Sequence, residues 1–118
     1  MGDRVIVVFI DDAFQAYTPG IYMHWTGEDA EKLIREAQPL MRRNDASYAA
    51  ARFCGYCHIK TDPPLGLGLL HPPAADDWDN YTPGDAGVYV VNVSTGEVQC
   101  HAGYGKAFVL DPQKFATP

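Results

Sequence analysis

The longest run of apolar residues in the chain lies close to its start. Residues 4–10 read Arg-Val-Ile-Val-Val-Phe-Ile, a β-branched and aromatic stretch that is typical of a β-strand. Because apolar side chains occupy both faces of this segment, we expect it to be central in a sheet. After the Pro19-Gly20 turn signal, apolar and polar positions alternate from Gly20 to Trp25, which predicts a second strand. The two strands are expected to form a hairpin with a long connection.

The middle of the chain changes to helical periodicity. Thr26-Gly27-Glu28-Asp29 combines a capping hydroxyl with an acidic first turn, which indicates a helix start. Pro39 is expected to end or kink this first helix just before it. Asn44-Asp45 is expected to cap a second helix that runs to about His58. The apolar stripes are Ala30, Leu33, Ile34, Ala37 and Met41 in the first helix, and Ala49, Ala50, Phe53, Cys54 and Cys57 in the second.

The second half of the chain returns to strands after an irregular region. Residues 61–87 contain three proline-based turn signals, and Leu65 to Leu70 is a candidate for a short strand. Val88 to Val93 predicts a clear strand, and Ser94-Thr95-Gly96 predicts a hairpin turn to a partner strand over Glu97 to His101. A further short apolar run, Ala107 to Leu110, lies in the tail.

The predicted order of elements is therefore β-β-α-α-β-β, which indicates the α+β class. We expect one domain over residues 1–118, with an antiparallel sheet of four to five strands and two helices on one face. The absence of β-α-β alternation argues against a doubly wound nucleotide-binding fold. The helices are expected to face Ile21, Met23, Val88 and Val90.

Composition and charge narrow the function classes. The chain has 118 residues, of which 47% are hydrophobic and 20% charged, as in an ordinary soluble globular domain. No apolar run has the length of a membrane span, and the residues after Arg4 do not form a signal peptide, so a cytoplasmic location is expected. The net charge of −6 disfavours direct binding to nucleic acid and permits docking on a basic protein surface.

The string Cys54-Gly55-Tyr56-Cys57-His58 matches the attachment pattern of c-type haem. Three features argue against that interpretation. No export signal is present, both cysteines already belong to the apolar stripe of an amphipathic helix, and the surrounding domain is rich in strands. We therefore expect no cofactor.

The same cysteines also suggest a zinc site. Cys54 and Cys57 could combine with Cys100 and His101 into a set of three cysteines and one histidine. Adjacent residues of a strand point to opposite faces, however, so only one of Cys100 and His101 can readily join. The expectation is three reduced, metal-free cysteines, and a zinc-stabilised structural module remains an alternative. A small enzyme or ligand-binding protein that uses His24, His101 and Asp85 in one cleft is a further alternative.

The stretch from residue 76 to residue 85 is acidic and carries aromatic residues. Tryptophan and tyrosine anchors within a charged rim are typical of protein interfaces. We therefore predict that a protein partner is contacted by Asp76, Asp77, Trp78, Asp79, Tyr81 and Asp85.

Two segments stand out, Tyr22-Met23-His24-Trp25-Thr26-Gly27 before the first helix and Asp85-Ala86-Gly87-Val88-Tyr89-Val90-Val91 at the start of the late hairpin. In these segments the chain resembles a group of small uncharacterised proteins of phages, plasmids and integrated bacterial elements. The group also has an Ala-Arg-Phe stretch in its second helix, here Ala51-Arg52-Phe53. The resemblance implies origin in a mobile element and carries over no catalytic residue.

Small acidic proteins of mobile elements often inhibit host defence, as anti-CRISPR proteins do, by occupying a surface of the target. By this analogy, the expected function is non-enzymatic inhibition of a host defence nucleoprotein complex in the bacterial cytoplasm. The expected partner is a host protein with a basic nucleic-acid-binding surface.

Overall fold

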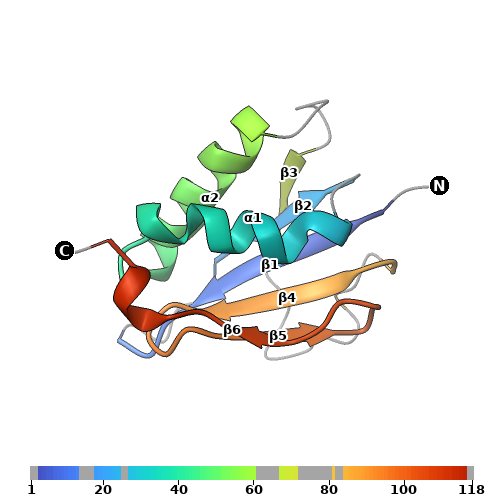
Figure 1. Ribbon diagram of the computed structural model, residues 1–118. Helices are drawn as coiled ribbons and strands as arrows, with labels where there is room; N and C mark the ends of the chain where they lie inside the picture. Colours follow the sequence, from blue (N-terminus) through green and yellow to red (C-terminus); the bar gives the residue numbers. More distant parts are fainter. Residues whose placement is uncertain are drawn as a thin grey trace.

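Two α-helices cover one face of a six-stranded sheet in the computed structural model (Figure 1). The structure describes residues 3–13, 18–24, 27–60, 67–71, 81 and 84–116. The helices are α1 (Ala30–Ala37) and α2 (Ala46–Lys60), with 3-10 turns η1 (Gly27–Asp29), η2 (Gln38–Leu40) and η5 (Pro112–Lys114). None of the described helices is long and apolar enough to cross a bilayer. The strands, in their order across the sheet, are β3 (Leu67–Leu70), β2 (Gly20–Met23), β1 (Val5–Ile10), β4 (Gly87–Asn92), β5 (Glu97–His101) and β6 (Phe108–Val109).

The predicted α+β class is confirmed, but the predicted sheet was wrong in two respects. The sheet has six strands rather than four or five, because the short apolar runs at Leu67–Leu70 and Phe108–Val109 both join it. It is also mixed rather than purely antiparallel. β1 pairs antiparallel with β2 but parallel with β4, with Val5 opposite Gly87. The parallel pair arises because the chain passes through both helices and β3 before it returns beside β1.

The main core lies between the sheet and the helices. From the sheet it takes the side chains of Val5, Val7 and Phe9 on β1 and of Ile21 and Met23 on β2. The helices contribute Leu33, Ile34, Ala37, Ala49, Phe53 and Cys57. The rings of Phe9 and Phe53 pack with their centroids 5.4 Å apart. This contact fixes α2 directly over the central strand.

The side chains of β4 have the opposite orientation to the one predicted. Val88 and Val90 lie on the sheet face turned away from the helices, here called the open face because no described helix packs on it. They are buried there against Ile6 and Val8 of β1. The residues that face the helices are Tyr89 and Val91. The pairing of β1 with β4 sets this orientation, because Ile6 stands opposite Val88 and cross-strand neighbours share a face.

Acidic side chains from distant parts of the chain help to start the helical segments. The Thr26 cap predicted for the first helix lies outside the described residues. In the structure, Oδ2 of Asp3 accepts a 2.7 Å hydrogen bond from the backbone N–H of Glu28. The predicted cap of the second helix is confirmed, because Oδ1 of Asp45 accepts from the Tyr48 N–H at 3.1 Å. Buried Asp11 adds a second acceptor there, 2.8 Å from the Ala46 nitrogen.

Candidate functional site

The predicted partner-binding residues fall partly outside the described structure. Asp76, Asp77, Trp78 and Asp79 lie outside the described residues, whereas Tyr81 and Asp85 lie within them. The Tyr81 ring packs against the apolar cluster of the open face, and its hydroxyl donates to the carbonyl of His71. A side chain at Gly20 would collide with this phenol. The C-terminal end of the predicted contact segment is thus held against the open face.

Asp85 is engaged by an ion pair at the edge of the open face. Its Oδ2 accepts from the backbone nitrogen of Arg4 at 3.0 Å and from Nε of Arg4 at 2.9 Å. The hydrogen bond from the Arg4 side chain, followed by that from the Arg4 backbone, holds the pKa of Asp85 below its usual value. A positive charge on His24 would lower the pKa of Asp85 further. The carboxylate therefore stays ionised and ties the start of β1 to the segment before β4.

A histidine and a tyrosine complete this group of side chains. The hydroxyl of Tyr22 lies 2.9 Å from Nδ1 of His24, and the two rings meet edge to face with centroids 6.0 Å apart. Together with the ion pair they form the Arg4 cluster, which we define as Arg4, Tyr22, His24 and Asp85. Sequence analysis missed Arg4 and Tyr22 as members of this site. The available signal was the position of Arg4 and Asp85, each just before a central strand.

The three residues of the enzyme alternative do not share one cleft. His24 follows β2, whereas His101 ends β5, and β1 and β4 lie between those two strands. Three strand spacings place the two histidine backbones about 14 Å apart. Asp85 and His24 interact electrostatically. The strand order thus does not support a pair of histidines acting on one atom.

The cysteines lie in separate environments. Cys57 of α2 is fully buried in the main core between the helices and the sheet, whereas Cys54 and Cys100 are partly exposed. Cys100 lies on β5, where its thiol donates to the Ala86 carbonyl at 3.4 Å. Among the residues that the structure describes, no three His, Cys, Asp or Glu side chains are grouped so as to hold a metal ion.

Burial suppresses the nucleophilicity of these thiols. Desolvation raises the pKa of Cys54 and Cys100, and it raises the pKa of Cys57 to about 12, with a further contribution from the charge of Cys54. The thiolate is the reactive form of cysteine. The protonated thiols at neutral pH are therefore poor candidates for catalysis.

Thiol reactivity gives a direct prediction. In the native protein at pH 8, Cys57 is almost entirely in the unreactive thiol form, because burial raises its pKa to about 12. We expect iodoacetamide to label Cys57 far more slowly in the native protein than in denatured protein. Within the native protein, Cys57 should also be labelled more slowly than Cys54. Peptide mass spectrometry of timed samples measures both rates. Native Cys57 labelling as fast as in denaturant would contradict its placement in the core.

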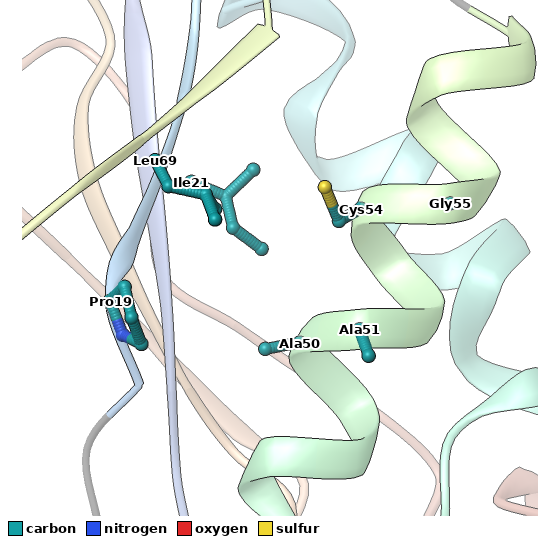
Figure 2. Close-up of a pocket in the computed structure, with 7 residues that line it drawn as sticks. All are labelled: Pro19, Ile21, Ala50, Ala51, Cys54, Gly55 and Leu69. Carbon is teal, nitrogen blue, oxygen red and sulfur yellow. The ribbon is translucent and has the colours of Figure 1, made fainter.

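An apolar pocket opens between α2 and the β2–β3 side of the sheet. It has a volume of about 260 Å³, and the Cys54 side chain points into it from the helix (Figure 2). The residues that line it are Pro19, Ile21, Ala50, Ala51, Cys54, Gly55 and Leu69. The sequence signal for this pocket is the spacing of Ala50, Ala51, Cys54 and Gly55, which places four small residues on one side of α2.

Comparison with known proteins found no matching family model, no matching curated protein and no matching solved structure.

Proposed function

We propose that the protein is a non-enzymatic product of a mobile element that inhibits a host defence nucleoprotein complex, as anti-CRISPR proteins do. It acts in the bacterial cytoplasm by binding a basic protein surface that would otherwise hold nucleic acid. The contact residues are the acidic and aromatic set from Asp76 to Asp85 that the sequence predicts. The sequence resemblance supports the mobile-element origin, and the negative net charge supports the binding mode.

The observation that carries the proposal is the uneven distribution of charge over the fold. Residues 27–60, which form the helical layer, hold six of the nine Lys and Arg residues and only five of the fifteen Asp and Glu residues. The rest of the chain therefore carries three cations against ten carboxylates. A basic partner would be attracted to the sheet and its connections and not to the helices.

Binding is favoured over catalysis by the state of the candidate reactive groups. The Asp85 carboxylate is held ionised by Arg4, which makes it a poor proton acceptor. The cysteine thiols have raised pKa values, and His24 and His101 lie on separate strands. Binding through an acidic surface does not require any of these groups to act as a general base or a nucleophile.

Affinity capture with charge variants tests the proposal. The triple variant Asp76→Asn, Asp77→Asn, Asp79→Asn removes three charges from the predicted contact segment. Its matched control, Glu28→Gln, Asp29→Asn, Glu36→Gln, removes three charges from the helical layer, where all three residues are exposed. The first variant is expected to lose the partner from host lysate and the control to retain it. Equal capture by both would contradict the acidic contact surface.

The Arg4 cluster supports a second candidate, in which the open face binds a small ligand through His24. The motivating geometry is the 2.9 Å approach of the Tyr22 hydroxyl to His24, next to an ionised Asp85. An activity or ligand lost in His24→Ala, with no protein partner captured, would favour this candidate over the binding protein.

A further inference from the structure

The two edge strands of the sheet differ in how they are protected. β6 has only two residues, and Arg35 donates to the carbonyl of Val109 at 3.4 Å. β3 has four residues, and no described residue beyond β2 forms a hydrogen bond to its backbone. An unprotected edge strand is a template for pairing with another strand.

Exposed apolar side chains gather on this same side of the molecule. Leu69 of β3 is 65% exposed although it lines the pocket, and Leu70 beside it is 41% exposed. Ile59, which is 81% exposed, lies one helical turn beyond Gly55. Among the described residues, no further element covers this helix face and strand edge.

Among the described residues, two glycines of these elements have no neighbour or backbone conformation that requires glycine. Each of the other described glycines has either a positive φ or a neighbouring atom that a side chain would crowd. By contrast, a Cβ on Gly55 or Gly68 would meet nothing within 4 Å. Glycine inside a helix or strand lowers stability, and in a strand it often marks a place where another backbone approaches closely.

Charge indicates which molecule can approach this edge. Neither α2 nor β3 contains a single Asp or Glu, although the chain as a whole has a net charge of −6. Two copies of an acidic protein repel one another through most of their surfaces. The edge formed by α2 and β3 lets two copies meet without placing carboxylates of these elements opposite each other.

We propose that the protein forms a symmetric dimer in which β3 pairs with β3 of a second copy and the sheet continues across the interface. A two-fold axis places the same surface on both sides, so the exposed leucines of one copy meet those of the other. The partner's Leu69 then lies beside the pocket, in the space that the missing side chain at Gly55 leaves. This proposal does not depend on the proposed function.

Sedimentation equilibrium over a range of concentrations tests the dimer. Leu69→Lys is expected to raise the dissociation constant by about tenfold or more, because both copies of the leucine leave the interface at once. Val109→Lys is the matched control, because Val109 is 63% exposed on the opposite edge strand. The control should dimerise like the natural chain. A natural chain that stays monomeric at about 1 mM, or equal weakening by both changes, would overturn the proposal.

Gly55→Gln separates a loss of dimer from a loss of folding. Glutamine favours the helix and has open space at this position, so the melting temperature of dilute protein should rise. The same side chain fills the space assigned to the partner and should weaken the dimer. A more stable protein with an unchanged dissociation constant would place the interface elsewhere.

Discussion

Replacing Phe53 with alanine is expected to lower the free energy of unfolding by about 3–5 kcal/mol. Phe53 is completely buried in the main core and packs against Phe9 of the central strand at a centroid distance of 5.4 Å. The truncation removes the contact that fixes α2 on the sheet and leaves a cavity that rigid neighbours cannot fill. Urea unfolding followed by far-UV circular dichroism measures the loss.

Ile59→Ala provides the matched control for Phe53 because it truncates another large apolar residue of α2. Ile59 is exposed, so its loss should change stability by less than about 0.5 kcal/mol. A cost below about 1 kcal/mol for Phe53→Ala would show that α2 does not pack as described.

Gly87→Ala is expected to lower stability by about 1–3 kcal/mol from backbone strain alone. Gly87 has a φ of +92°, and a Cβ there would collide with the carbonyl of His101 and lie 2.8 Å from the Gly103 nitrogen. Because these neighbours are backbone atoms, they cannot move aside without disturbing the start of β4. Thermal unfolding of the variant measures the effect.

Gly55→Ala is the control for the Gly87 change. In the single chain its Cβ would enter open space within a helix, so the stability of protein dilute enough to be monomeric should rise by about 0.5–1 kcal/mol. Opposite signs for the two substitutions are the expected result. Destabilisation of similar size by both would mean that the environments of the two glycines are not those described.

The sequence predicted the elements better than their pairing. Local periodicity and the turn at Gly96 were sufficient to predict β1, α2 and the β4–β5 hairpin. Gly96 has the positive φ, +86°, that this turn requires. The parallel pairing of β1 with β4 joins segments about 80 residues apart. Apolar residues on both faces of β1 indicate a central strand but do not give the direction of its neighbours.

The orientation of β4 was unpredictable for a related reason. Val88, Tyr89, Val90 and Val91 are all apolar and all buried, so the strand has no polar positions to show which face meets the helices. Only the pairing with β1 decides this.

The candidate site was predicted only in part. Asp85 was identified from an acidic, aromatic stretch, but its partner Arg4 lies 81 positions away in the chain. No local pattern connects the two residues. Their pairing follows from two central strands that start side by side, which is a property of the fold.

The salt dependence of partner binding, measured by surface plasmon resonance on the captured partner, tests the central claim most directly. Exposed charges are screened beyond about 8–10 Å at physiological ionic strength, so association should slow steeply as salt rises. Neutralising Asp76, Asp77 and Asp79 should reproduce this slowing at low salt, whereas Trp78→Ala should instead speed dissociation. An association rate independent of salt and unaffected by all four changes would contradict binding through the acidic segment.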